Sequence, residues 1–423
     1  MSEWKKVKLE ELYEVHNGLS KGRQFFGTGF PFLTFSNVFN NWFLPKQLES
    51  LVQTTDKERE SCSIKAGDVF ITRTSETMDE LGMSSVALRD YPNATYNGFT
   101  KRLRPITDRV NPRYIGYYLR TPKFRGQFMA FSSMTTRASL ANNDLLNMEV
   151  ELPPMEIQHR IATILSRYDS LIENYQKQIK LLEEAAQRLY KEWFVDLHFP
   201  GHENTKIVDG VPEGWEKNAF GSVIDYEIGG GWGSDTKTTN EIIPAFVIRG
   251  TDMSTLDMGI WKELPYRFHQ ESNYRARQLM HNDIIFEVSG GSKNEGVAKT
   301  FLVQQELLDK LDNHVICASF CKLIRLKDSS IAYYIYDTLK EWRASGITAQ
   351  YDKRSASSIV NYRWKDFLSQ QEILIPNEIV LRDYIKKSEL IHSSITNKSS
   401  QIRLLTEARD RLLPKLMSGE IAV

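Results

Sequence analysis

Cysteine and histidine are few in this sequence, with 3 and 8 residues, and they form no recognisable catalytic set. Cys317 and Cys321 fit one packed face of a predicted strand, without further Cys or His at zinc-ligand spacing. His159 and His198 have no nucleophile arranged beside them. The glycine-rich residues 229–233 lack a surrounding strand–helix–strand pattern, and neither a phosphate-loop motif nor an amino-methyltransferase Asn-Pro-Pro-aromatic motif occurs. The sequence therefore predicts no catalytic residue, no metal site and no cofactor in this chain.

Basic side chains interleaved with aromatic ones are better candidates for function. The whole chain of 423 residues is neutral, with 54 Lys and Arg against 54 Asp and Glu, so bulk charge does not indicate a nucleic-acid partner. Residues 101–125, however, contain a single acid, Asp108, among Lys101, Arg102, Arg104, Arg109, Arg113, Arg120, Lys123 and Arg125. Two interpretations stay open: a solvated face around a small core, or a surface that follows DNA phosphates.

A second basic group lies later in the chain and is diluted by acids. It consists of Lys322, Arg325, Lys327, Arg343, Lys353, Arg354 and Arg363. If both groups bind DNA, we expect Arg104 to support affinity for any sequence and the first group to contact DNA more densely.

Reading bases requires polar side chains on loops that can enter a groove, and three such loops occur in each half of the chain. In the first half they are residues 21–25, 73–77 and 135–143, with the candidates Lys21, Arg23, Gln24, Arg73, Thr74, Ser75, Arg137, Ser139 and Asn142. In the second half they are residues 232–239, 289–295 and 352–358, with Ser289, Ser292, Lys293, Asn294, Lys353 and Arg354. For each single residue, a plain surface role remains an alternative.

The chain repeats itself. Residues 67–72 are echoed by 282–287, residues 99–104 by 320–325, and the pair Tyr117-Tyr118 by Tyr333-Tyr334. The offset grows along the chain, which indicates one framework carrying different insertions. Short β-rich runs at 69–72, 284–288 and 315–326, with short helices at 114–120 and 331–341, predict that each repeat is an α+β domain.

Each repeat ends in a long helical pattern. In the first, apolar residues alternate at spacings of four and three, as in a coiled-coil seam; its members include Ile161, Ile164, Tyr168, Leu171, Tyr175, Leu182 and Leu189, with Gln178 as the polar exception. The second seam includes Ile391, Ile395, Ile402, Leu405 and Leu412, and Asn377 is its expected N-cap. The helices either pack separately on their own domains or pair antiparallel. At about 1.5 Å per residue, either would span roughly 50–60 Å.

Several segments, in this order, resemble the specificity subunits of type I restriction–modification systems. They are Leu152-Pro153-Pro154-Met155-Glu156-Ile157 at the start of the first long helix, Leu181-Leu182-Glu183-Glu184-Ala185 leading to Trp193-Phe194-Val195-Asp196, Val211-Pro212-Glu213-Gly214-Trp215 at the entry to the second half, and Arg411-Leu412-Leu413-Pro414-Lys415 near the end. Together with the repeat, the resemblance covers nearly the whole chain.

The resemblance implies an α+β fold with two pseudo-twofold-related target-recognition domains, joined by two long antiparallel coiled-coil helices. It places the domains at residues 1–154 and 213–377, the helices at 155–196 and 378–417, a linker at 197–212 and a tail at 418–423. The implied partners are double-stranded DNA with a split target, two modification subunits and, through them, restriction subunits. S-adenosylmethionine, Mg and ATP would then be bound only by those partner subunits.

Two alternatives remain beside this interpretation. The partner is either a type I complex or a fused nuclease–methyltransferase, because the docking helices would look alike. A protein of another class, a coiled-coil scaffold without DNA, would show the same helices. Three cysteines, no apolar N-terminal stretch and no bilayer-length apolar run predict a cytoplasmic protein without a membrane partner.

Overall fold

The computed structural model describes residues 4–75, 81–131, 138–257, 264–290, 296–312, 314–354 and 359–423. The chain forms two compact units, Met1–Ser170 with Thr406–Val423 and Leu171–Leu405, called unit 1 and unit 2 below. Each long helix therefore contributes one part to each unit. No helix in the described residues is both long enough and apolar enough to cross a membrane.

Unit 1 is a mixed α+β unit built on a four-stranded antiparallel sheet. The order is β2 (Tyr13–Asn17), β9 (Thr100–Pro105), β5 (Val69–Thr72) and β7 (Ser84–Val86). In a second sheet, β3 (Phe26–Leu33) pairs antiparallel with β4 (Leu51–Val52) and parallel with β8 (Thr95–Tyr96), while β1 (Lys5–Lys8) pairs with β11 (Glu149–Leu152) and β6 (Thr74–Ser75) with β10 (Ala138–Ser139). Its helices are α1 (Phe35–Asn40), α2 (Asp56–Ser61), α3 (Pro112–Tyr118), α4 (Pro122–Phe131), α5 (Asn142–Leu146) and the first part of α6 (Met155–Tyr190).

Unit 2 repeats this topology. Its four-stranded sheet has the order β15 (Ile224–Gly229), β22 (Cys321–Leu326), β18 (Ile284–Glu287) and β20 (Thr300–Leu302). The other strands are β16 (Ile243–Ile248) with antiparallel β17 (Tyr266–His269) and parallel β21 (Val315–Cys317), β14 (Glu216–Ala219) with β25 (Glu372–Ile375), β19 (Ser289–Gly290) with β24 (Val360–Tyr362) and β23 (Asp352–Arg354), and the hairpin β12 (Ile207–Val208) with β13 (Val211–Pro212). Its helices are α7 (Gly250–Asp257), α8 (Glu271–Arg277), α9 (Gln305–Lys310), α10 (Ala332–Ala344), α11 (Trp364–Gln370) and most of α12 (Glu378–Met417).

The shared strand order shows that the repeat seen in the sequence is a repeat of fold, which confirms the α+β prediction. One predicted element is wrong in detail: residues 315–326 are two strands, β21 and β22, that belong to different sheets. A turn separates them, closed by a hydrogen bond from the Cys321 amide to the Ala318 carbonyl at 2.8 Å. Strand propensity alone did not reveal this turn because buried residues stand on both sides of it.

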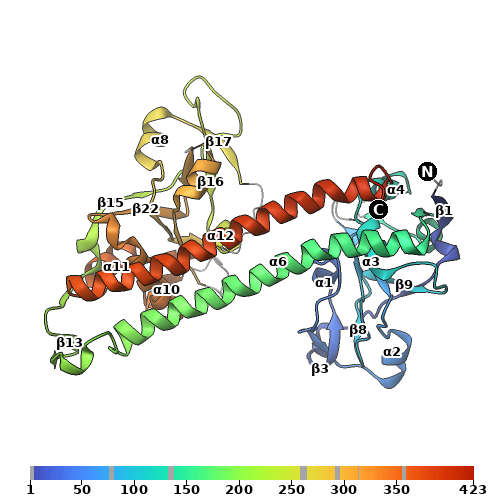
Figure 1. Cartoon of the computed structure of the whole chain (residues 1–423), viewed down its shortest axis with the longest axis horizontal. Coiled ribbons are helices and arrows are strands. Elements are labelled where there is room, and N and C mark those ends of the chain that lie inside the picture. The colour runs from blue at the N-terminus through green and yellow to red at the C-terminus, as the bar shows by residue number, and fades with distance from the viewer. Residues whose placement is uncertain are drawn as a thin grey trace. The chain divides into compact units, whose positions relative to one another are not determined.

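Within unit 2, α6 and α12 run side by side and antiparallel (Figure 1). The ring centroids of Tyr190 and Tyr384 lie 6.1 Å apart, and the Lys398 amine lies 5.6 Å from the Tyr175 ring. Residue numbers thus rise on one helix as they fall on the other. Asn377 caps α12 as predicted, since its side-chain oxygen accepts from the Val380 amide at 3.0 Å.

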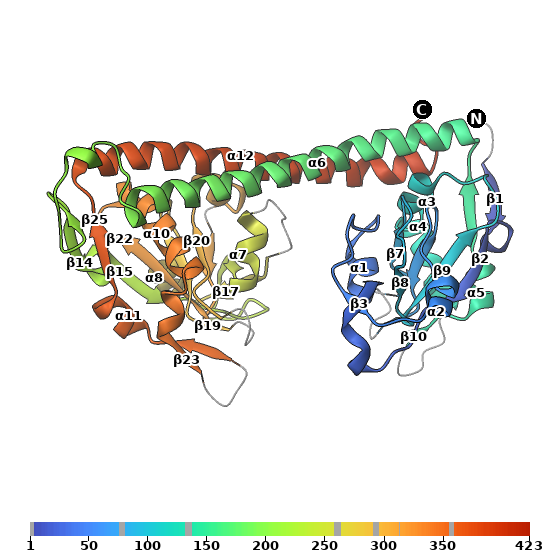
Figure 2. The same ribbon diagram turned by 90° about the horizontal axis from the view of Figure 1, so that it is seen from below.

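A buried carboxylate on α10, Asp337, binds α12 within unit 2. The two helices lie next to each other in Figure 2. Asp337 on α10 accepts hydrogen bonds from Tyr384 at 2.7 Å, Ser388 at 2.6 Å and His392 at 2.8 Å, three residues one helical turn apart on α12. Burial opposes the charge, but His392 and the hydroxyl donors outweigh it and lower the pKa of Asp337. The anchor is thus an ionised group with its donors supplied by one helix face.

The apolar seam of α6 differs from the predicted one at Leu171 and Gln178. Among the predicted residues, Ile161 is buried and Ile164, Tyr168, Tyr175, Leu182 and Leu189 are half-buried, but Leu171 is 44% exposed. The neighbouring Ile172 is half-buried and Ile179, one residue after Gln178, is buried. The prediction is therefore wrong for Leu171: both phases keep the spacing of three and four, so periodicity alone does not choose between them.

The second long helix, α12, contributes most of its predicted seam residues to buried contacts. Ile395 and Ile402 form one buried cluster with Ile179, and Ile391, Tyr175, Leu182 and Ile172 pack against it. Leu405 is half-buried. Leu412 packs on the core of unit 1, where Leu413 and Leu416 are buried with Ile161.

Candidate nucleic-acid interface

In unit 1, backbone hydrogen bonds bring two of the candidate loops, and the residues that lead into the third, to one edge of the four-stranded sheet. The turn at residues 97–100 lies at its centre: the Arg73 amide donates to the Phe99 carbonyl at 3.0 Å, and the Gly98 amide donates to the Leu19 carbonyl at 2.7 Å. The Leu140 amide donates to the Arg73 carbonyl at 3.1 Å, next to the β6–β10 ladder. We call the described residues 19–24, 73–75, 97–100 and 138–142 edge 1.

Unit 2 repeats the arrangement around the turn that precedes β22. The amides of Val288 and Ser289 donate to the Phe320 carbonyl at 2.9 and 3.2 Å, and the Gly230 amide donates to the Cys321 carbonyl at 2.9 Å. The described part of the third candidate loop, β23, is joined to this edge by β24, which lies between β19 and β23. We call the described residues 230–234, 288–290, 318–321, 352–354 and 360–361 edge 2.

The glycine-rich stretch has a structural reason rather than a nucleotide-binding one. A side chain at Gly230 would place its Cβ 2.2 Å from the Ala318 carbonyl oxygen, and one at Gly18 would meet the Asn97 carbonyl at 2.1 Å. Only glycine allows the loop after the first strand to approach the central turn this closely in either unit. Both glycines therefore place a candidate loop at its edge.

The candidate side chains at the edges differ in how accessible they are. Arg23, Gln24 and Lys353 are exposed. Lys21 instead forms an ion pair with Glu58 at 2.6 Å, and the Ser289 hydroxyl donates to the Asn361 side chain at 2.9 Å. The backbones of Thr74, Ser75, Ser139 and Arg354 lie in the strands of the two edges, whereas Arg137, Ser292, Lys293 and Asn294 lie outside the described residues.

The expectation of an exposed basic face over residues 101–125 is wrong for its first two members, Lys101 and Arg102. Arg102 is buried, and its guanidinium donates to the backbone carbonyls of Ser61 at 3.3 Å and Ser63 at 2.7 Å. Lys101 is also buried, donates to the Asn142 side chain, and has its pKa lowered by burial and by Arg73. These two consecutive residues point to opposite faces of β9, an inner strand of its sheet, and both are buried.

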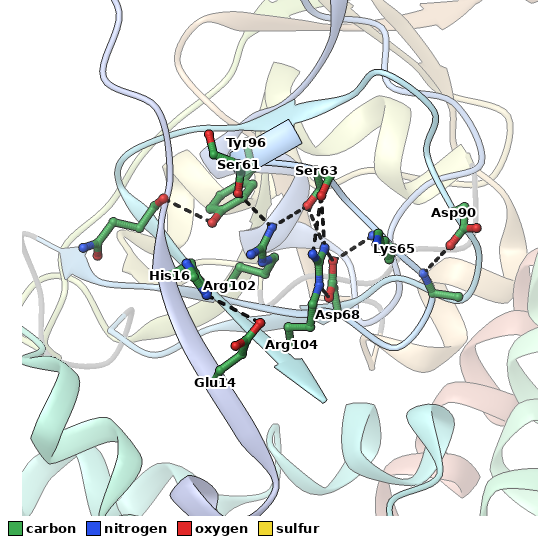
Figure 3. A network of polar contacts seen from close by, with 12 residues as sticks. Glu14, His16, Ser61, Ser63, Lys65, Asp68, Asp90, Tyr96, Arg102 and Arg104 are labelled. Carbon is green, nitrogen blue, oxygen red and sulfur yellow. Dashed lines mark hydrogen bonds and ion pairs between the residues drawn. The ribbon is translucent and has the colours of Figure 1, made fainter. Parts of the chain in front are cut away.

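Arg104 belongs to an internal ion pair (Figure 3). Its Nε and Nη2 atoms donate to the two oxygens of Asp68 at 2.8 and 2.7 Å, and Nη2 also donates to the Ser63 carbonyl at 3.0 Å. Asp68 further accepts from the Lys65 amide at 2.7 Å, and its bond to Arg104 raises the pKa of the guanidinium. This bidentate pair orders the start of β5 and the end of β9.

The same bidentate Arg–Asp ion pair recurs in unit 2. Arg325 donates through Nε and Nη2 to the two oxygens of Asp283 at 2.8 and 2.7 Å, and Asp283 accepts from the Met280 amide at 2.7 Å. Lys322 pairs with Glu227 and lies 5.3 Å from the Trp364 ring. Arg325 and Lys322, which were predicted to bind DNA, thus each already form an ion pair within unit 2.

Arg120, which lies outside the sheet, also uses its guanidinium for hydrogen bonds within unit 1. It donates to the carbonyls of Ser84 at 2.5 Å, Val38 at 2.9 Å and Asn41 at 2.9 Å, and burial lowers its pKa to about 10. The arginine thus ties β7 to the C-terminal end of α1. Its place in a basic run of sequence did not reveal this because every acceptor lies at least 36 residues away.

One positioning residue escaped the sequence reasoning. Arg267 on β17 lies 4.6 Å from the ring of Trp232 and forms an ion pair with Asp235. It therefore holds the loop that begins at Trp232 from a strand more than thirty residues away along the chain. No local signal in the sequence links the two segments.

The described residues contain no group of acids, Cys and His suited to hold a metal ion. Cys317 and Cys321 are free and buried, and burial raises the pKa of Cys317 to about 12. A thiol with so high a pKa is protonated at neutral pH and is a poor nucleophile.

Comparison with known proteins gives a consistent result. Residues 1–184 match the family model of the type I restriction modification DNA specificity domain. A type I restriction enzyme MjaIX specificity subunit from Methanocaldococcus jannaschii is 25% identical over 100% of this chain and 94% of its own, and the HindI specificity subunit of Haemophilus influenzae is 22% identical over 100% of both. The crystal structure of the type I restriction–modification S subunit from M. genitalium has the same fold, with a TM-score of 0.54 at 12% identity over 98% of this chain and 96% of that one.

The chain is thus similar to type I restriction–modification specificity subunits along its whole length. In this chain the two edges are built alike but carry different side chains. Arg73 of edge 1 corresponds to Val288 of edge 2, since the amides of both donate to the carbonyl of the central turn. Edge 1 also has the exposed Arg23, while edge 2 has the exposed Lys353. One framework thus presents two different loop surfaces.

Proposed function

We propose that this chain reads a bipartite, asymmetric DNA target, with edge 1 contacting one half-site and edge 2 the other. The convergence of three loops at one edge, in each of two repeats, carries the proposal. Polar side chains on loops held by a rigid sheet suit base reading in a groove. The difference between Arg73 and Val288 suits two half-sites of different sequence.

The proposed partners are two modification subunits, which bind along α6 and α12 and recruit restriction subunits. Methyl transfer, ATP hydrolysis and cleavage are assigned to those subunits, and with them the binding of S-adenosylmethionine, Mg and ATP. The chain itself is proposed to be non-catalytic. A fused nuclease–methyltransferase would use the same docking helices and is the alternative partner.

Selection from a randomised duplex pool tests the proposal, using the full chain co-expressed with its modification subunit. We expect enrichment of a split motif with a fixed gap, and binding that weakens with salt because Lys and Arg displace counterions from phosphates. Co-purification of the two subunits checks the docking. Failure to enrich any motif, or binding insensitive to salt, would contradict DNA reading and favour a scaffold.

A matched pair of lysine variants locates the contact. Lys353→Ala removes an exposed cation of edge 2, and Lys206→Ala removes an exposed cation of the linker. If edge 2 binds DNA, Lys353→Ala reduces the slope of log affinity against log salt concentration by about one, whereas Lys206→Ala leaves this slope unchanged. Equal effects of the two variants would remove edge 2 from the interface.

A further inference from the structure

A large apolar side chain is exposed at the centre of each edge. Phe99 is 60% exposed in unit 1 and Phe320 is 57% exposed in unit 2. They occupy equivalent positions, directly before β9 and β22, and the carbonyl of each accepts the amide of the strand-end residue, Arg73 or Val288. Their neighbours differ: Gly98 and Thr100 flank the first, Ser319 and Cys321 the second.

The fold does not require phenylalanine at either position. What each residue contributes to the sheet is its backbone carbonyl, which any amino acid supplies. Single exposed apolar residues are common on protein surfaces. Here, however, the same residue type is exposed at the same turn in two repeats whose neighbouring residues have diverged, and polar loops surround both turns.

The surroundings indicate what such a ring contacts. At edge 1, Arg73 and Leu19 lie on either side of the turn through backbone hydrogen bonds, and at edge 2, Val288 and Gly230 take the same places. If these loops reach into a groove, the central residue enters with them. A phenyl ring there has no hydrogen bond to offer, but it can pack on a thymine methyl or press between stacked bases.

We propose that Phe99 and Phe320 contact the apolar surface of a base, one in each half-site, and that each determines specificity at one position. The inference rests on the proposed function, since it presumes that the two edges face DNA. The rings lose water-exposed apolar surface when the complex forms, which favours binding. Because both rings are exposed in the free chain, replacing them removes a DNA contact without removing core packing.

The test uses the full chain co-expressed with its modification subunit and three variants, Phe99→Ala, Phe320→Ala and the control Ile106→Ala. Ile106 is 58% exposed and follows the opposite end of β9, so it matches Phe99 in exposure but lies away from edge 1. We expect each Phe variant to bind the wild-type site about tenfold more weakly and to lose preference at one position of its own half-site. Ile106→Ala keeps both affinity and motif, and all three melt at the wild-type temperature.

Two modified duplexes identify the base surface. Deoxyuridine in place of thymine removes the methyl group, and 2-aminopurine becomes more fluorescent when its stacking is broken. A loss of wild-type affinity with deoxyuridine supports a methyl contact, and a fluorescence rise that Phe99→Ala abolishes supports a wedge. If affinity falls in the variants but neither duplex responds, the rings touch only the DNA backbone and the inference is overturned.

The outcomes separate this inference from the proposed function. If the wild-type chain enriches no motif, the proposed function fails and the inference fails with it. If the wild-type chain enriches a split motif and both Phe variants enrich the same motif with unchanged affinity, only the inference fails. Phe99→Leu, which keeps an apolar group, is expected to retain more affinity than Phe99→Ala.

Discussion

At the scale of single residues, the sequence shows where charge is but not what it is paired with. Arg104 and Arg325 stand in basic runs, and their equivalence in the repeat was correctly predicted. Each nevertheless meets an acid far away in the chain, Asp68 at a separation of 36 residues and Asp283 at 42. Only the register of β9 against β5, and of β22 against β18, brings these pairs together.

The ion pair between Arg104 and Asp68 predicts that Arg104→Ala destabilises unit 1 rather than weakening DNA contacts directly. Asp68 has no exposed surface, so losing Arg104 leaves a buried carboxylate without its cation, at a cost of about 3 kcal/mol. Urea unfolding of the full chain measures this as an earlier first transition. Arg23→Ala, which removes an exposed arginine of edge 1, is the control and should leave that transition unchanged. Unaltered unfolding of Arg104→Ala would contradict the structural role.

At the scale of elements, local sequence patterns predicted individual strands and helices, whereas contacts between distant segments were not predictable from them. The strand β5 and the start of α6 agree with the pattern of the sequence because each depends on its own residues. The phase of the α6 seam was not predictable: Gln178 and Ile179 both keep a heptad spacing, and contact with Ile395 and Ile402 places Ile179 inside. The loops of each edge were chosen for their polar residues, whereas their convergence depends on bonds across the chain.

The seam predicts opposite results for two residues eight positions apart on α6. Ile179→Ala removes a side chain that is 1% exposed and leaves a cavity in the helix pair, at a cost of about 2–4 kcal/mol. Leu171→Ala changes a side chain that is 44% exposed, so its cost should stay within about 0.5 kcal/mol. Thermal and urea unfolding compare the two variants. A larger loss for Leu171→Ala would restore the seam that periodicity first suggested.

At the scale of the whole molecule, the repeat was legible in the sequence because its framework residues recur in order. Asp68 and Asp283 pair with equivalent arginines, and the carbonyls of Phe99 and Phe320 accept from the equivalent amides of Arg73 and Val288, although the offset between the halves drifts. The loops escaped such alignment, since insertions such as α9 and the added strand β23 occur in unit 2 without a counterpart among the described residues of unit 1. Shared framework and differing loops are what the proposed asymmetric target would require.

The continuity of α6 and α12 through both units leads to a prediction about the gap between half-sites. Tyr175 and Lys398 face each other in the antiparallel pair, so seven residues inserted after each would preserve the seam of both helices. Seven residues add about 10 Å of helix, close to three base pairs of DNA rise. If the helices separate the two reading edges, selection with the doubly extended chain yields the same half-sites with a gap longer by about three base pairs.

Insertion into α6 alone is the control, because it leaves α12 too short to keep the cluster of Ile179, Ile395 and Ile402 in register. That variant should lose affinity and its modification subunit together, as measured by co-purification and by binding to the wild-type site. Should the doubly extended chain instead select the original gap, the helices would be docking elements only, and the spacing of the half-sites would have to arise from the partner subunits.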